Sequence, residues 1–195
     1  MEPLRFSLKR VVKEKNAELD ACKLLGAPVF PAGLMDSGKI EEGDYFVAQI
    51  RCDAFPARPP FPSKGYLYFF VNIDSLQAKV IYSEEEPAEL VDDINDSFDV
   101  ESCGDPTCLQ MIFGEESGSY IFGEVDQDIG LEGYADLDGK LTLLEIDAFS
   151  LPQDGQRPLR FGNYGVADGH WIFLIKEEDL KKGRYDRVEF VETEV

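Results

Sequence analysis

Apolar residues along the chain gather in short runs that polar, glycine-rich or proline-rich segments separate. Residues 45–50 are apolar except for Gln49, and residues 65–71 begin with glycine and continue as an aromatic and aliphatic run. Continuous apolar runs of this length, bounded by turn-forming residues, are typical of strands buried on both faces. A third run at 79–82 predicts a short strand that returns antiparallel to the second.

The pattern of residues 65–76 recurs at residues 169–180. Both segments begin with glycine, place phenylalanine fifth (Phe69 and Phe173), turn acidic and reach leucine at the twelfth position. Each therefore predicts a buried strand followed by a tight turn or a short helix.

Other segments show the same correspondence. The run 108–114 corresponds to residues 24–26, and Glu145 corresponds to Gln49. The offset between counterparts is 88 residues at the first pair, 96 at the second and 104 at the glycine-led strands. Loop insertions after a duplication would produce such a growing offset. We therefore expect an α+β fold, mostly antiparallel β, with two similar halves from an internal duplication sharing one core.

The 195 residues are enough for one domain. We expect a single domain over residues 1–195, with approximate halves at 1–85 and 107–195 and an acidic connector at 86–106. Within the connector, Pro87 and the spacing of the apolar residues after it predict a short helix.

The two ends of the chain carry weaker patterns. Residues 4–12 fit a strand by their alternation and one face of a helix by their spacing, so both alternatives stay open. Residues 188–192 alternate and predict a closing strand at a sheet edge, where charges discourage aggregation. Residues 120–139 are rich in glycine and predict loops.

The anchor segments resemble those of the YwqG-like proteins, a family of unknown function. The resemblance covers most of residues 24–190, and it is carried by Leu25-Gly26-Ala27-Pro28, Val47-Ala48-Gln49-Ile50, the strand 65–71, Leu143-Leu144-Glu145-Ile146-Asp147, and the stretch from Ala167-Asp168-Gly169 to Asp179-Leu180. These positions are mainly glycines and core residues, so the resemblance implies a fold.

The resemblance implies little chemistry. The family has no agreed catalytic residues, and some members lie beside toxin genes, which implies an immunity or interaction role. Many relatives carry a Cys-x-x-Cys pair before the Gln-Ile strand, whereas residues 35–44 here contain no cysteine and Glu145 replaces a second glutamine. A metal role suggested by relatives therefore does not carry over.

The charge of the chain narrows the choice of partner. With 39 acidic and 19 basic residues, the formal net charge is −20. Such a field repels phosphate backbones and anionic lipids and attracts basic proteins, so we expect no nucleic-acid or membrane partner. No apolar run approaches the ~20 residues of a membrane span, and no secretory signal is visible, which favours a cytoplasmic location.

Residues 84–99 hold eight carboxylates and not one lysine or arginine. Most must be solvated, because burying unpaired carboxylates is costly. We expect an acidic face for a basic partner, with solubility alone as the simpler alternative. The candidate binding residues are Glu84, Glu85, Glu86, Asp92, Asp93 and Asp96, and a corresponding acidic region of the second half holds Asp126, Asp128, Glu132, Asp136 and Asp138.

His170 is the only histidine, so any Ser-His-Asp or Cys-His arrangement must use it. A strand histidine without catalytic function is the simpler interpretation, because no activated nucleophile is identifiable beside it. We assign no catalytic residue. If a small ligand or a hydrolytic reaction is instead the function, we expect a pocket between the halves, with candidate residues Gln49, Glu145, His170 and Trp171.

Two motifs could hold a metal, and both have simpler interpretations. Cys103 and Cys108 could share a zinc ion, yet a full set of four ligands is not evident, so free thiols are preferred. Residues 126–130 and 136–139 resemble fragments of a calcium loop, but Asx turns account for them. We expect no metal and no cofactor. The leading hypothesis is a non-enzymatic, protein-binding module.

Overall fold

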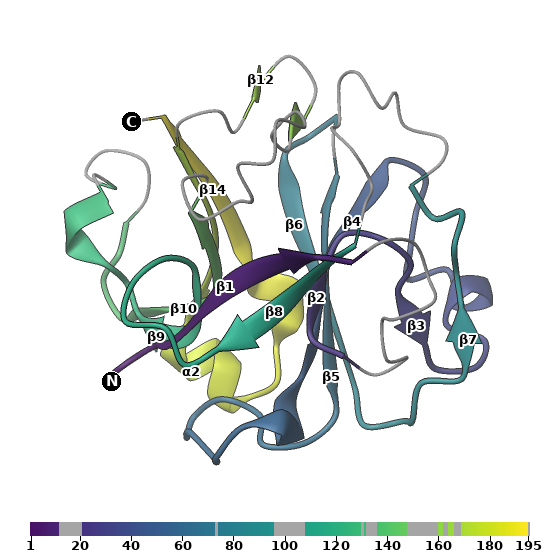
Figure 1. Ribbon diagram of the computed structural model, residues 1–195, viewed down its shortest axis with the longest axis horizontal. Helices are drawn as coiled ribbons and strands as arrows, with labels where there is room; N and C mark the ends of the chain where they lie inside the picture. The colour runs from purple at the N-terminus through teal and green to yellow at the C-terminus, as the bar shows by residue number, and fades with distance from the viewer. Residues whose placement is uncertain are drawn as a thin grey trace.

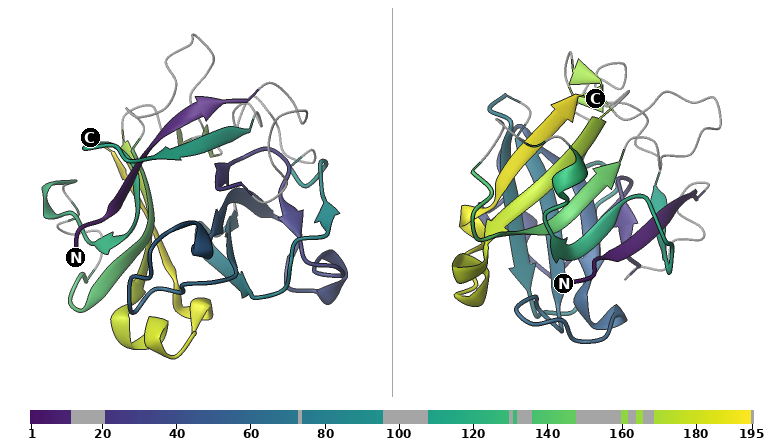
Figure 2. Two further views of the ribbon diagram at one scale, coloured as in Figure 1. Left: turned by 60° about the horizontal axis from the view of Figure 1, so that its bottom comes forward. Right: turned by 90° about the vertical axis from the view of Figure 1, so that its left-hand side faces the viewer.

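A computed structural model describes residues 1–11, 21–72, 74–95, 108–129, 131, 136–147, 160–161, 164–165 and 169–194. The fold is mostly antiparallel β, as the sequence predicts, and ten strands form one sheet that curls into a nearly closed barrel (Figures 1 and 2). The strands of this sheet are β1 (Leu4–Arg10), β2 (Lys23–Leu24), β4 (Asp44–Arg51), β5 (Tyr66–Asn72), β6 (Gln77–Ser83), β8 (Leu109–Phe113), β9 (Tyr120–Glu124), β10 (Lys140–Asp147), β13 (Gly169–Lys176) and β14 (Glu189–Glu194).

Shorter elements lie around this sheet. Two pairs of short strands form separate ladders, β3 (Val29–Phe30) with β7 (Glu89–Leu90) and β11 (Arg160–Phe161) with β12 (Tyr164–Gly165). The described helical segments are η1 (Met35–Ser37), η2 (Cys52–Ala54), η3 (Gln127–Ile129), α2 (Glu177–Lys181) and η5 (Tyr185–Arg187). None of the described helices has the length and apolar character that crossing a membrane requires.

The order of the strands shows an exchange between the two parts of the chain. The sheet runs β14-β13-β10-β9-β1-β8-β2-β4-β5-β6. Strand β1 therefore lies against β9, which comes much later in the chain, and β8 lies against the early strand β2. Figure 1 shows β1 and β8 side by side across the middle of the molecule. Each part of the sheet contains one strand from the other part.

The pairing of β1 with β8 extends over five residue pairs, from Phe6–Phe113 to Arg10–Leu109. Ser7 lies opposite Ile112, Phe6 opposite Phe113 and Leu8 opposite Met111. Each of the two strands also donates a backbone hydrogen bond to the residue just before its other neighbour in the sheet: the Phe6 N–H donates to the Ser119 carbonyl, before β9, at 2.9 Å, and the Met111 N–H donates to the Cys22 carbonyl, before β2, at 3.1 Å.

Two of the long strand pairs, β4–β5 and β10–β13, share an irregularity. The β4–β5 register shifts between Phe46 and Ala48, and the β10–β13 register shifts between Thr142 and Leu144. After the shift, Ala48 faces Phe69 in the first pair, just as Leu144 faces Phe173 in the second. A bulge places two residues opposite one and bends the strand, so both strand pairs bend at the same register position.

Two non-glycine residues next to these strands share an unusual backbone conformation. Leu25, just after β2, and Phe122, in β9, both have a φ of 55°. Residues other than glycine rarely adopt a positive φ, and residues with branched or bulky side chains do so least often. Both residues are nonetheless buried, so packing in the core holds them there.

The structure confirms most of the expected strands and corrects three expectations. Residues 4–10 form strand β1, which settles the alternative left open there. The run 108–114 does not occupy the place of residues 24–26: the strand beside β10 is β9, whereas the strand beside β4 is β2. Strand β9 also begins at Tyr120, inside the segment expected to be loop.

The short helix expected after Pro87 is absent from the described residues 74–95. Instead, β7 pairs with β3. The Ala88 N–H donates to the Phe30 carbonyl at 2.8 Å, and the Val91 N–H donates to the Pro28 carbonyl at 3.1 Å. These long-range bonds hold the segment extended, because the isolated helical turn offers little competing stability.

Side chains from both parts of the chain fill the interior of the barrel. Phe69 and Phe173, the fifth residues of the two glycine-led segments, are both fully buried, and their ring centroids lie 5.1 Å apart, edge to face. Two smaller clusters cover the outside of the sheet. One is centred on Phe30, Phe46, Tyr68 and Phe70, and the other on Val125, Leu131, Ile172 and Leu174.

Phe69→Ala should destabilise the fold by about 3–5 kcal/mol, and Phe173→Ala by a similar amount, because each empties a well-packed buried site. The double variant should lose less than the sum, since either single change already removes the contact between the rings. Chemical denaturation followed by fluorescence measures these free energies of unfolding.

Met35→Ala is the control, because Met35 is 40% exposed and its truncation should change stability by no more than ~0.5 kcal/mol. Strict additivity of the two phenylalanine substitutions would show that the rings do not stabilise each other across the core.

Candidate functional site

The four expected pocket residues do not form one pocket. Gln49 is fully buried and ties neighbouring segments together. Its Oε1 accepts a hydrogen bond from the Val29 N–H at 2.8 Å, and its Nε2 donates to the Ala21 carbonyl at 3.4 Å. Trp171 lies in the barrel core and donates from Nε1 to Glu192 at 3.2 Å. Both residues therefore support the fold.

Glu145 and His170 do come together. The register places Asp147 opposite His170 and Glu145 opposite Ile172, so the carboxylate and the imidazole lie on the same face of adjacent strands. His170 Nδ1 lies 2.5 Å from Glu145 Oε1. Glu145 is almost fully buried, and the His170 side chain is 13% exposed. The carboxylate therefore fixes the orientation of the ring.

Polar groups from β1 and β9 extend this pair along the sheet. Tyr120 faces Glu145 across the β9–β10 pair, and its hydroxyl lies 3.2 Å from Thr142 Oγ1. The Arg5 guanidinium stacks over the Tyr120 ring at 5.3 Å and lies 3.9 Å from Asp126. We call Arg5, Tyr120, Asp126, Glu145 and His170 the carboxylate–histidine cluster.

The electrostatics of the cluster favour a protonated imidazole. The hydrogen bond to Glu145 raises the pKa of His170 above its ordinary value; desolvation opposes that rise, and the charges of Glu145, Asp147 and Asp126 support it. Burial raises the pKa of Glu145, while its bond to His170 pulls that pKa back. A carboxylate-oriented histidine can accept and return a proton. No described hydroxyl or thiol lies within hydrogen-bonding distance of the imidazole, so the described residues do not complete a catalytic triad.

The described residues also contain no group of three or more histidine, cysteine or carboxylate side chains able to hold a metal ion. Cys22, Cys52 and Cys108 are free thiols, and burial raises the pKa of Cys52 and of Cys108. Cys103 lies outside the described residues. The two loops that resemble calcium-loop fragments form Asx turns: the Asp128 N–H donates to Asp126 at 3.0 Å, and the Asp138 N–H donates to Asp136 at 3.2 Å.

The expected acidic face lies on the flank formed by β3 and β7. Its carboxylates are exposed, and we call them the acidic flank: Glu84, Glu85, Glu86, Glu89, Asp92 and Asp93. Asp96 and Glu132 lie outside the described residues. Glu84 pairs with Lys64 at 2.5 Å, and Glu89 accepts a hydrogen bond from the Gly33 N–H at 3.2 Å. Within the described part of the chain, the other four carboxylates have no ion pair.

Apolar side chains stand among these carboxylates. Leu90, in β7, is 49% exposed, and Met35, in η1, is also exposed. Exposed apolar anchors in a polar rim are typical of protein interfaces.

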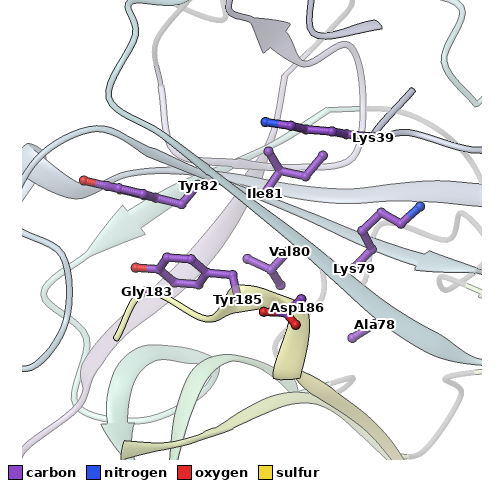
Figure 3. A pocket seen from close by; sticks show the side chains of 9 residues that line it. All are labelled: Lys39, Ala78, Lys79, Val80, Ile81, Tyr82, Gly183, Tyr185 and Asp186. Carbon is purple, nitrogen blue, oxygen red and sulfur yellow. The ribbon is translucent and has the colours of Figure 1, made fainter. Parts of the chain in front are cut away.

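A groove that the sequence does not predict lies at the seam of the barrel. Its volume is about 490 Å³, and strand β6 forms one wall while the turn containing Gly183, Tyr185 and Asp186 forms the other (Figure 3). Lys39 closes one side. The walls thus come from residues before 85 and after 107, but none of the four expected pocket residues lines the groove. We call it the seam groove.

Comparison with models of known protein families and with curated protein sequences finds no match. The functional interpretation therefore rests on the motifs and the geometry described above.

Glu145→Gln should lower the pKa of His170, because it removes the largest cause of the upward shift and leaves the opposing desolvation. His170 is the only histidine, so its titration by NMR needs no assignment. The protonated ring contributes stability that is complete below its unfolded pKa of about 6.5 and is lost as the pH rises through the raised folded pKa. That part of the pH dependence should vanish in the variant.

Asp126→Asn is the matched control, because its charge is the weakest of the named influences on the imidazole and its loss should lower the pKa least. An unchanged His170 pKa in the Glu145→Gln protein would mean that the carboxylate does not hold the ring in solution.

Proposed function

We propose that the chain is a YwqG-like domain that works as a non-enzymatic protein-binding module, with the acidic flank as the surface for a basic protein. The observation that carries this proposal is the exposed Leu90 in a rim of six carboxylates, of which only Glu84 has an ion pair within the described residues. An apolar anchor provides affinity through burial, and the carboxylates select a basic partner.

The overall charge supports the same partner. A net charge of −20 attracts a basic protein over a distance and accelerates its encounter at low salt. Like charges held close together on one flank also repel each other, and binding a cation-rich surface would relieve that repulsion. The most specific partner of this kind is a basic toxin, which the chain would bind and neutralise as an immunity protein does.

We further propose that the fold arose by internal duplication, with β1 and β8 exchanged between the halves 1–85 and 107–195. Four features support this. The strand order is similar when followed from either end of the sheet, and the β4–β5 and β10–β13 pairs bulge at the same register position. Leu25 and Phe122 share a φ of 55°, and the backbone hydrogen bonds that Phe6 and Met111 donate correspond to each other. The duplication places the two halves in one domain with one core.

A second candidate function is the binding of a small ligand between the halves. The seam groove favours it, because its walls come from both parts of the chain and combine apolar side chains with Lys39 and Tyr185. Hydrolysis at this groove has no support from the described lining residues, since no histidine or cysteine is among them.

Removing four charges from the acidic flank should slow association with its partner by roughly tenfold at low ionic strength, and this difference should shrink as salt is added. The partner is first isolated from native lysate at low salt and then purified for stopped-flow kinetics. The variant carries Glu85→Gln, Glu86→Gln, Asp92→Asn and Asp93→Asn.

The control removes the same number of exposed carboxylates elsewhere, by Glu2→Gln, Glu42→Gln, Asp74→Asn and Glu116→Gln. Leu90→Ala should instead accelerate dissociation, because the anchor acts after encounter. Equal slowing by both charge variants, or binding that ignores salt, would overturn the acidic flank as the binding surface.

A further inference from the structure

The ten-stranded sheet ends at β14 and at β6, and each of these two strands has one backbone edge that forms no ladder in the described part of the chain. Strand β6 is the last strand of the ten-stranded sheet and pairs with β5 alone. Strand β14 and η5 also lie close to β6 in space but form no ladder with it. No other backbone hydrogen bond to residues 77–83 is found within the described part of the chain.

The lining of the seam groove shows which part of β6 it exposes. Five consecutive residues, Ala78 to Tyr82, line it. Side chains of consecutive strand residues point to opposite faces, so a surface on one face of the strand would include only every second residue. The groove therefore follows the edge of the strand, where its outward N–H and C=O groups lie. Figure 3 shows this edge running between Lys39 and the turn that carries Tyr185.

An unpaired strand edge accepts a specific kind of occupant. An extended peptide supplies backbone N–H and C=O groups at the spacing that the edge requires, and a compact small molecule does not. The apolar side chain of Val80 is largely buried at the groove, so it favours apolar side chains on the face of the added strand that lies on the same side.

The charges around the groove favour one further feature of the bound peptide. Lys79 is already paired with Glu41 at 2.8 Å and with Asp44, and Asp186 lies 3.5 Å from Arg187. The exposed ammonium of Lys39 has no ion pair among the described residues. A carboxylate on the added strand, on the same side as Lys39, would provide its counter-charge.

We propose that the seam groove binds an extended segment of another polypeptide, which adds to β6 as an eleventh strand, packs the apolar side chains of one face against Val80, and places a carboxylate of the opposite face beside Ile81 and Lys39. The proposal rests on the second candidate function, that the groove is a binding site, and is independent of the acidic flank. It replaces a small molecule by a peptide as the ligand.

The test uses the full chain and a fluorescent hexapeptide, acetyl-Thr-Val-Glu-Val-Thr-Val. Two isomers carry N-methyl groups on either the odd or the even residues, so each blocks hydrogen bonding along one edge of the peptide only. Fluorescence anisotropy should show that one isomer binds like the unmodified peptide and the other about tenfold or more weakly, since it loses several backbone hydrogen bonds.

Equal affinity of all three peptides would overturn strand addition while leaving the groove as a binding site. No binding of the unmodified peptide would overturn the groove as a peptide site, and the acidic-flank proposal would stand unaffected.

The role of Lys39 has its own comparison. Replacing the peptide's glutamate by glutamine should weaken binding to the wild-type chain several-fold and leave binding to Lys39→Met unchanged. Lys176→Met, a change at an exposed lysine outside the groove, should retain the preference for glutamate. A preference that survives Lys39→Met would contradict the proposed carboxylate position.

Discussion

The pairing of β1 with β8 is the interaction on which the rest of the structure depends. These two strands lie at the middle of the sheet order, with four strands on either side. Because β1 also pairs with β9 and β8 with β2, each strand joins its own part of the chain to the other. Phe6 and Phe113 reinforce the junction, with ring centroids 5.4 Å apart. Without this pair, the sheet would separate into two open fragments with exposed edges.

A single curled sheet explains where polar chemistry can occur. Its inner face is filled by the core that Phe69 and Phe173 share. The three candidate sites lie instead on the outer face and at the seam. The carboxylate–histidine cluster occupies the outer face of β9, β10 and β13, the acidic flank surrounds β3 and β7, and the seam groove follows the free edge of β6. Each location follows from the order of the strands.

The sequence predicts the parts of this fold that local pattern encodes. Apolar runs identify β4, β5, β10 and β13, because strands buried on both faces leave an uninterrupted signal. The mismatch of residues 108–114 with 24–26 arose because a shared glycine is a local feature, whereas the neighbour of each strand is set by long-range pairing. The expected helix after Pro87 failed for the same reason, since hydrogen bonds to Pro28 and Phe30 decide that segment.

The candidate sites show the same limit. The sequence identifies Glu145 and His170 as candidates but not as a pair, because 25 residues separate them and only the β10–β13 register brings them together. The sequence predicts Gln49 and Trp171 as pocket residues, but both are buried and support the fold. In a strand that is apolar on both faces, the sequence does not show which face borders a pocket. The seam groove was missed because no local pattern indicates that β6 ends the sheet.

Co-expression of the two parts of the chain tests the central pairing most directly. A tagged fragment 1–100 and an untagged fragment 101–195 are produced together, captured through the tag and examined by circular dichroism. If β1 and β8 are exchanged as described, the fragments will co-purify as a one-to-one complex with the spectrum and cooperative unfolding of the intact chain, and neither alone will fold. Two fragments that fold separately and do not associate would contradict the account.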